Sequence, residues 1–519
     1  MMSCAVAAMI VSGLANAQEN EPETEDQERV EDTIIVVGSK LGLNLQETVD
    51  SVELLTEERL ENDGVFELTD ALARTPNVSV IGDNLNTINI RGINRNGTGG
   101  AGPGQAINIF LDGAPLSNNA LISSADVLWD VQQVEVLRGS QSILQGRNAI
   151  AGAVVLTTND PTYEWEGAGR AIIGEFGERR YSGLISGPII KDQLAFRLSA
   201  DYSESDGFIT NFNTGGPDDS GEDLAVRGKL LFEPNALKDL RAELSVEYTE
   251  SDSLRTGPVI IGSGGPAGED NLAPERIARL QNLDFGSDVS FSSFLPSSDV
   301  ETVRIIGDLS YHFTDNISVD FVGTYEQADR MANNTEIIDN PFSDLGNFSD
   351  SEAKTYSADL RVNFDYDKLT GVVGAYYFDT KADTVGRTVN LISDVVPFPL
   401  NPADSVFAFD SLGIAETDNI AAYTSWRYEP NDKWAFDVGL RYDEEKFANQ
   451  SIVTRDIEIL PDGCLVTVPL AFLLGAPVPG FQTLPCTQAA TVLRANLPQD
   501  QIISEGFGVF LPSGAITYN

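Results

Sequence analysis

Residues 301–325 read ETVRIIGDLSYHFTDNISVDFVGTY, and apolar side chains occupy every second position in two stretches of this segment. The first stretch covers residues 303–313 and the second covers residues 317–325, with the short polar link Thr-Asp-Asn between them. Because successive side chains of a β-strand point to opposite faces, this period of two predicts an antiparallel hairpin with one apolar and one polar face. The single His of the chain, His312, falls in the polar phase, so we expect a structural residue rather than a metal ligand.

The same alternation runs from Glu166 to the end of the chain, in segments about eleven residues long, the length of a tilted transmembrane strand. Short links (314–316, 367–368, 429–433) alternate with long ones (251–301, 330–353, 382–415, 449–504). An outer-membrane barrel separates turns from loops in this way, whereas a soluble sandwich has no reason to do so. We therefore predict an antiparallel transmembrane β-barrel with about twelve strands between Glu166 and Asn519. Aromatic residues at the strand ends suit the girdles of a barrel, with core packing as the alternative: Tyr248, Tyr311, Phe313, Trp426, Tyr428, Trp434 and Tyr442.

Residues 51–161 have a different, compact α/β pattern. Thr56 is a candidate N-cap for a helix with Glu57 and Glu58 in its first turn, and a second short helix is predicted over residues 66–74. Short strands are predicted at 78–81, 88–90, 107–111, 134–137 and 153–157. The glycine-rich stretch at 95–105 contains a formal G-x-G-x-x-G match, but Pro-Gly at 103–104 prevents the helix that would hold a pyrophosphate, so we interpret it as a loop.

Composition excludes several classes of function. The 519 residues include 79 Asp and Glu against 33 Lys and Arg, which gives a formal net charge of −46. Such a chain repels a phosphate backbone, so we do not expect it to bind nucleic acid. With one His and three Cys, it lacks the ligands of a His/Cys metal site and the usual general base. We predict no catalytic residues, no metal site and no cofactor, and therefore no enzyme.

An export signal is predicted at the N-terminus. Residues 4–17 (CAVAAMIVSGLANA) form an apolar run that ends in Ala-Asn-Ala, which fits cleavage before Gln18. The run is too short to span a membrane as a helix, and no Lys or Arg precedes it, so a buried helix is the alternative. Residues 18–32 are acidic and typical of a solvated tether. Residues 33–37 (TIIVV) either add as a strand to a partner's sheet or form the first strand of the next domain.

Two cysteines, Cys464 and Cys486, lie in the last long link of the barrel region. In an exported protein we expect them to form a disulfide, which would contribute about 3 kcal/mol in the chain-entropy model. Two free thiols are the alternative.

Three motifs in the α/β region resemble, in order and spacing, the plug-domain signature of the TonB-dependent outer-membrane receptor family. They are IRGI at 90–93, FLDGAP at 110–115 and VEVLRGSQSILQGRNAIAGAV at 134–154, and DGFITN at 206–211 resembles a segment early in the family's barrel. Two positions depart from the pattern: Ser140 stands where Pro is common, and Gln145 where an aromatic residue is common. The resemblance covers essentially the whole chain and implies a mainly β fold, with a small α/β plug inside an antiparallel transmembrane barrel. The implied domains are a signal peptide (1–17), a tether with a TonB box (18–47), a plug (48–161) and the N-terminal part of a barrel (162–519).

The resemblance also implies the site residues. The family's TonB box, which pairs with the energy-coupling protein TonB of the inner membrane, corresponds by position to Asp32, Thr33, Ile34, Ile35, Val36 and Val37. The plug motifs supply Arg91, Gly92, Asp112, Gly113, Glu135, Arg138, Gly139, Gln141, Gly146, Arg147 and Gly152. Of these, we expect Arg91, Glu135, Arg138 and Arg147 to make charge contacts with the polar barrel wall, with a solvated plug surface as the alternative.

The segments 94–105 and 115–124 resemble the apical plug loops that meet the ligand. The candidate substrate-facing residues in them are Asn96, Gly97, Gly99, Gln105, Asn118 and Asn119.

The function implied by the resemblance is uptake of a scarce nutrient at the outer membrane of a Gram-negative bacterium, with energy from the inner membrane. A ferric siderophore is the expected ligand, and carbohydrate, cobalamin or haem are alternatives. A passive porin or a surface adhesin is the alternative of another class, and a signalling receptor is disfavoured because only the short tether precedes the TonB box. We expect a monomer whose partners are the TonB complex, outer-membrane lipid and the nutrient.

The strand count departs from the family, whose barrels close with about twenty-two strands. About twelve strands would leave unpaired edges in lipid, which is not tolerated. We therefore predict that this chain is a C-terminally truncated piece of a longer protein.

Overall fold

The computed structural model of the 519-residue chain describes residues 37–40, 51–80, 85–95, 105–122, 127–146, 149–211, 217, 219–254, 289–290, 297–334, 346–391, 406–431, 433–456, 465–469, 481–485 and 500–518. The predicted export signal, the tether and residues 32–36 of the predicted TonB box lie outside the described residues. The same holds for Asn96, Gly97, Gly99, Arg147, Cys464 and Cys486. The disulfide between the two cysteines therefore stays a prediction.

Residues 51–158 form a small α/β domain, which we call the plug. Its main sheet has the order β1-β7-β8-β5-β6, formed by β1 (Ser51–Thr56), β7 (Val131–Arg138), β8 (Gly152–Thr158), β5 (Ile107–Leu111) and β6 (Ala114–Pro115). Neighbouring strands are antiparallel except β5 and β8, which are parallel. A second sheet consists of β2 (Val78–Ser79), β3 (Asn89–Ile90) and β4 (Ile93–Asn94).

The helices of the plug are short. Helix α1 (Glu57–Asn62) begins after Thr56, whose side-chain oxygen accepts a hydrogen bond from the Arg59 backbone N–H at 3.4 Å, so the predicted cap is confirmed. Helix α2 (Leu68–Ala73) starts later than predicted, because Phe66 accepts a backbone hydrogen bond from Leu128 and Glu67 is extended. Single 3₁₀ turns lie at η1 (Val37–Ser39), η2 (Leu85–Thr87) and η3 (Ala120–Ile122). No helix of the described residues is long and apolar enough to cross a membrane.

The plug has a conventional apolar core. Leu60 of α1 and Leu72 of α2 belong to one buried cluster with Val134 and Val136 of β7. Phe110 of β5, Leu137 of β7 and Val155 of β8 belong to a second, smaller cluster, so the apolar residues of the predicted short strands are divided between two clusters.

A twelve-stranded antiparallel sheet makes up the rest of the fold, as predicted. In spatial order its strands are β24 (Asp500–Tyr518), β21 (Trp434–Asp456), β20 (Val406–Asn431), β19 (Leu369–Leu391), β18 (Gly346–Tyr366), β17 (Ile317–Asn334), β16 (Ser297–Thr314), β14 (Leu240–Leu254), β13 (Gly221–Phe232), β11 (Leu194–Ser205), β10 (Arg179–Ile190) and β9 (Glu166–Ile173). Two small pairs lie apart from it: β12 (Thr210–Asn211) with β15 (Val289–Ser290), and β22 (Leu465–Pro469) with β23 (Phe481–Pro485).

Several strands are longer than the eleven or so residues predicted. Strand β20 has 26 residues, and β19 and β21 have 23 each, so parts of the predicted long links 330–353 and 382–415 belong to the sheet. The backbone ladder continues past the point where the outward side chains change from apolar to charged, as at Glu250 and Asp252 after Tyr248. The apolar pattern measures the membrane-facing part of a strand, and hydrogen bonding decides its full length.

The sheet has an inverted distribution of polarity. On β16, Arg304 is 2% exposed, whereas Leu309 on the opposite face is 43% exposed. Glu247 of β14 and Arg197 of β11 are likewise buried. The odd-numbered, apolar phase of β16 thus points outward and the polar phase points inward, as predicted from the alternation.

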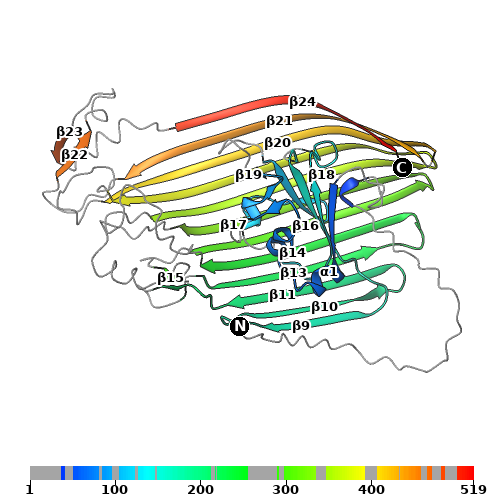
Figure 1. The fold of residues 1–519 in the computed structure, drawn as a ribbon, viewed down its shortest axis with the longest axis horizontal. Coiled ribbons are helices and arrows are strands. Elements are labelled where there is room, and N and C mark those ends of the chain that lie inside the picture. The colour runs from blue at the N-terminus through cyan, green and yellow to red at the C-terminus, as the bar shows by residue number, and fades with distance from the viewer. Residues whose placement is uncertain are drawn as a thin grey trace.

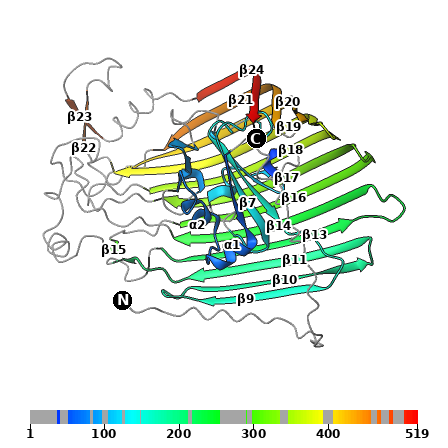
Figure 2. The ribbon, with the colours of Figure 1, turned by 45° about the vertical axis from the view of Figure 1, so that its right-hand side comes forward.

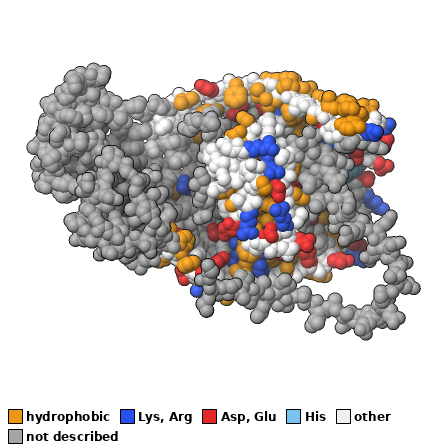
Figure 3. Space-filling view, in the orientation of Figure 1, with side chains coloured by type: hydrophobic (Ala, Val, Ile, Leu, Met, Phe, Trp, Pro, Cys, Tyr) orange, Lys and Arg blue, Asp and Glu red, His pale blue; other side chains and the backbone are white. Residues whose placement is uncertain are grey.

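The plug lies on the polar face of the sheet, in front of its central strands in both Figure 1 and Figure 2. Figure 3 shows Lys and Arg intermixed with Asp and Glu over the plug at the centre of this view, while hydrophobic side chains gather along the border formed by the last strands. The sheet therefore presents a charged wall to the plug and an apolar surface to its other side.

Candidate functional site

The plug is fixed to the wall by charged contacts, of which the pair between Asp130 and Arg197 has the most hydrogen bonds. Asp130 precedes β7, and its carboxylate accepts from Arg197 Nε at 2.8 and 3.0 Å and from Nη2 at 2.6 Å. Arg197 Nη1 also donates to Glu166 at 3.1 Å. This planar, two-pronged pairing fixes orientation as well as charge. A second contact in this region joins the indole N–H of Trp129 to the Gly183 carbonyl at 3.1 Å.

Asp112 and Gly113, two residues of the predicted plug motif, also lie at the wall. The Asp112 carboxylate accepts hydrogen bonds from the Thr158 backbone and hydroxyl at 2.8 and 2.6 Å and lies 3.3 Å from the Lys229 ammonium of β13. Burial alone would raise the pKa of Asp112, but Lys229, Arg227 and the two hydrogen bonds from Thr158 together outweigh burial and hold the pKa below its usual value. Gly113 has a φ of +83°, and a Cβ there would lie 3.3 Å from Val322 of β17. Both the backbone conformation and the close approach of the wall therefore favour glycine at this position.

Glu135 has a different role from the one predicted. Its carboxylate accepts from the backbone N–H of Val37 at 2.7 Å, from that of Gly38 at 2.8 Å and from the Gln133 amide at 2.8 Å. The predicted contact of Glu135 with the barrel wall is therefore wrong, because strand β7 points this side chain at the N-terminal segment. Burial raises the pKa of Glu135, and the two backbone donors oppose that effect.

The predicted wall contact of Arg138 is also wrong. Its guanidinium donates to the Pro76 carbonyl at 3.0 Å and lies 3.8 Å from Glu53, so its partners belong to the plug. Arg91 is exposed and lies in a tight turn, with a positive φ of 52°. Its backbone N–H donates to the Asn77 carbonyl at 2.9 Å. The motif glycine Gly92 follows in the same turn with a φ of +81°.

The remaining motif residues shape close approaches. A Cβ on Gly146 would lie 2.7 Å from Arg441 Nη2 in β21, and one on Gly152 would lie 2.3 Å from the Leu137 carbonyl. Gly139 has a φ of +124°, and the Gln141 N–H donates to the Ala149 carbonyl at 2.8 Å. These residues are defined by backbone geometry rather than by side-chain chemistry.

The segment after the predicted TonB box is held from two sides. Lys40 lies 2.9 Å from Asp359 of β18, whose other oxygen accepts from the Tyr423 hydroxyl of β20 at 2.7 Å. Burial lowers the pKa of Lys40, and Asp359 opposes that shift. On the plug side, the Gln145 amide donates to the Gly38 carbonyl at 2.6 Å. Neither Lys40 nor Asp359 was predicted, although the polar phase of residues 356–364 marked Asp359 as inward-facing.

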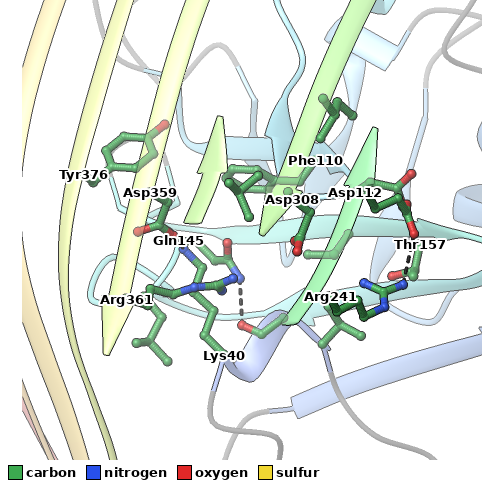
Figure 4. Close-up of a pocket in the computed structure, with 18 of the residues that line it drawn as sticks. Lys40, Phe110, Asp112, Gln145, Thr157, Arg241, Asp308, Asp359, Arg361 and Tyr376 are labelled. Atoms are coloured by element: carbon green, nitrogen blue, oxygen red, sulfur yellow. Dashed lines mark hydrogen bonds and ion pairs between the residues drawn. The ribbon is translucent and has the colours of Figure 1, made fainter. Parts of the chain in front are cut away.

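A cavity of about 310 Å³ separates this part of the plug from the wall. In Figure 4, Lys40, Asp359 and Arg361 lie together on one side of it, and Arg241 and Asp112 lie on the other. Charges of both signs thus line a gap between two surfaces that are otherwise in contact.

The predicted apical residues Gln105 and Asn118 meet at a buried arginine. Arg95 donates to the Asn118 side-chain oxygen at 2.9 Å and to the Gln105 side-chain oxygen at 2.7 Å, and the two amides also contact each other. Burial lowers the pKa of Arg95 to about 9. Asn119 contacts the wall instead, donating to the Ser351 hydroxyl at 3.0 Å. Within the described ranges, no group of three or more His, Cys, Asp or Glu side chains is placed to hold a metal ion.

Comparison with known proteins gives two family matches. Residues 44–153 match the model of the TonB-dependent receptor plug domain, and residues 261–519 match that of the TonB-dependent receptor-like β-barrel. The chain is 29% identical over 181 residues to the ferrioxamine B receptor of Salmonella typhimurium, a match that covers 32% of this chain and 25% of that protein. It is 24% identical over 241 residues to the ferripyoverdine receptor of Pseudomonas aeruginosa, covering 45% and 27%. The matched part thus spans about a quarter of the length of these curated relatives.

Solved structures share the fold at low identity. The siderophore receptor PiuA from Acinetobacter baumannii gives a TM-score of 0.65 at 16% identity, over 92% of this chain and 64% of that one. The ferric yersiniabactin uptake receptor FyuA from Yersinia pestis gives 0.63 at 17% identity, over 88% and 62%. These receptors therefore share the fold of this chain.

Proposed function

The chain belongs to the TonB-dependent receptors of the Gram-negative outer membrane, and from this premise we propose that it binds a ferric siderophore at the cell surface and imports it into the periplasm. Energy for import comes from the TonB complex of the inner membrane. The family consists of transport receptors, and we infer that this chain has no enzymatic activity.

One observation carries the proposal: a polar wall with a separate plug docked on it. Arg197, Lys229 and Asp359 of the wall each pair with a charged plug-side group, namely Asp130, Asp112 and Lys40. A wall of this polarity would otherwise line a wide aqueous pore. A plug attached by ion pairs, with a cavity over part of its contact with the wall, is suited to being moved without unfolding the barrel. This supports gated import over free diffusion.

The siderophore preference rests on the relatives. Their names specify ferrioxamine B and ferripyoverdine, and the structural neighbours include a ferric yersiniabactin receptor. Carbohydrate, cobalamin and haem remain the alternatives within the family. The cluster of Arg95, Gln105 and Asn118 gives the plug a hydrogen-bonding apex against which a polar ligand would rest.

The proposed site of energy input is the TonB box, residues 32–37. Its last residue, Val37, begins η1 and is held at the plug by Glu135. An apolar, β-branched segment adjoining this anchor is suited to pairing as a strand with a periplasmic partner.

Deletion of residues 32–37 tests the proposal in the host bacterium. We expect uptake of iron-loaded ferrioxamine B or pyoverdine to be lost while binding to the cell surface persists. Deletion of residues 20–25 (NEPETE), six residues of the tether, is the matched control and should leave uptake unchanged.

Unchanged uptake in the 32–37 deletion would contradict energy coupling through this segment. Growth stimulation by a carbohydrate, cobalamin or haem in place of the iron-loaded siderophores would reassign the ligand. Constitutive conductance in planar bilayers would favour a passive porin.

A further inference from the structure

Two buried plug side chains form hydrogen bonds with the main chain of Gly38, one with its N–H and one with its carbonyl; we call this pair of contacts the grip. Its N–H donates to Glu135 Oε2 at 2.8 Å, and its carbonyl accepts from Gln145 Nε2 at 2.6 Å. The adjacent Val37 N–H donates to the other Glu135 oxygen at 2.7 Å. Glu135 and Gln145 are both buried, so all three hydrogen bonds lie in a water-poor environment. Two of them have the Glu135 carboxylate as acceptor.

The space around Gly38 fits a residue without a side chain. A Cβ on Gly38 would lie 2.5 Å from Leu137 Cδ1 and 2.9 Å from Glu135 Oε2. The first distance is too short for any ordinary contact, so with a larger residue either the segment or the buried Leu137 side chain would have to shift.

The order of the anchors along the chain matters for a pulling force. The Lys40 N–H donates to the Val37 carbonyl at 3.0 Å, which closes a tight turn between the grip at Gly38 and the ion pair with Asp359. A partner that pulls on residues before Val37 therefore loads Glu135 and Gln145 first and the Lys40 anchor on the wall second.

Gln145 also connects the grip to the wall. It belongs to the plug turn at 141–146, where the Ile143 carbonyl accepts from Arg441 Nη1 at 3.4 Å and Gly146 packs on the same guanidinium. Arg441 is itself fixed by two hydrogen bonds to Asp443, at 2.7 and 2.9 Å. Withdrawal of Gly38 thus removes a hydrogen bond from the plug turn that contacts the wall.

We propose that Glu135 and Gln145 form a main-chain clamp for Gly38 that controls how readily the TonB box becomes accessible to its partner. In this role they are positioning residues. Gln145 occupies one of the two positions at which the chain departs from the plug signature it resembles, and its amide supplies the donor to the carbonyl. The inference rests on the proposed function, since it assigns a control to the same energy-coupling segment.

The clamp is tested by the mobility of a spin label at position 37. The Val37→Cys variant, made in a Cys464→Ser/Cys486→Ser background, carries the label on an exposed side chain and keeps the backbone bonds of residue 37. Adding Gln145→Leu removes the donor to Gly38, and adding Glu135→Gln replaces one acceptor oxygen by an amide that cannot accept. In each, we expect the ratio of mobile to immobile spectral component to rise about tenfold, as loss of a buried hydrogen bond to the segment predicts.

Two further variants serve as a control and as an independent disruption of the clamp. Glu53→Gln lies on β1, beside β7 in the same sheet, but its carboxylate faces Arg59 and Arg138, so the label should stay immobile. Gly38→Ala crowds the clamp from the segment side and leaves the Glu135 and Gln145 side chains chemically unchanged, so it should mobilise the label even if a Glu135 variant fails to fold. An immobile label in Gln145→Leu and Gly38→Ala would overturn the clamp.

Binding of the purified periplasmic domain of TonB separates this inference from the proposed function. Faster association with Gln145→Leu and Gly38→Ala than with the otherwise identical parent supports control of access. A mobile label with unchanged association would overturn that control. Absence of binding to every variant, the parent included, would contradict the proposed function, whereas the label alone would still report whether the clamp exists.

Discussion

The plug and the sheet bury opposite kinds of side chain. In the plug, Leu72 and Val136 are fully buried and the charged residues lie mostly at its surface, as in a water-soluble domain. In the sheet, Arg304 and Glu247 are buried while Leu309 is exposed on the outer face. The difference shows that the two regions suit different surroundings. The plug excludes water from its core, whereas the sheet requires an apolar environment outside and a polar one inside.

The buried charges of the sheet form a continuous chain rather than isolated pairs. Arg227 donates to Glu247 at 2.6 Å, and Arg304 lies between Glu247 and Glu326, with 2.7 Å to the latter. Glu326 then accepts from the plug at the Ser117 N–H, 2.9 Å away. Such a network is favourable when every member is satisfied and costly when one is removed.

Arg304→Leu should therefore produce the largest loss of stability among single changes in the two regions. It leaves two buried carboxylates without their shared cation, and we expect a loss of about 4 kcal/mol in the free energy of unfolding, measured by urea titration in detergent micelles. Arg304→Lys keeps the charge and should recover part of the loss. A loss below about 1 kcal/mol, the range of exposed ion pairs, would contradict the burial of this network.

Leu72→Ala tests the plug side of the comparison. Removal of a fully buried leucine should cost about 3 kcal/mol, because it leaves a cavity in a packed core. The matched control is Leu309→Ala on the outer face of the sheet, where lipid or detergent fills the space and the loss should be smaller. Equal losses for the two leucines would mean that the outer face of the sheet is packed like the core of the plug.

Asp112→Asn probes the contact between the two regions. The folded-state pKa of Asp112 is lowered, so its contribution to stability is present above the unfolded pKa, about 4, and is lost as the pH falls through the folded value. We expect the variant to be less stable by about 2 kcal/mol at pH 7, because a hydrogen-bonded charge pair is lost. The same urea titration repeated at low pH should give a smaller difference. A difference that grows on acidification would have the wrong sign for this contact.

Much of the fold could be predicted because it depends on local pattern. The period of two gave the twelve strands and their inward and outward faces, and Thr56 marked the start of α1. Strand length escaped prediction, since β20 continues by backbone hydrogen bonding beyond its apolar segment.

The site was less predictable, for a physical reason. Asp112 and Gly113 could be singled out by motif, but whether a charged residue meets the wall or the plug depends on how strands far apart in sequence are placed. Glu135 and Arg138 face plug-side partners, while Lys40 pairs with Asp359, 319 positions away. The periodicity of one chain segment does not indicate which residues of distant segments its side chains will contact.

The inverted sheet is tested most directly at two adjacent isoleucines of β16. Ile305 is 39% exposed on the outer face, whereas Ile306 is 5% exposed and packs with Ala114 of the plug and Val322 of β17. Spin labels on Ile305→Cys and Ile306→Cys, in the same Cys464→Ser/Cys486→Ser background and in lipid vesicles, report contact with oxygen dissolved in the bilayer. We predict high oxygen accessibility at position 305 and low accessibility at 306. Equal accessibility at the two positions, or the reverse order, would contradict this prediction.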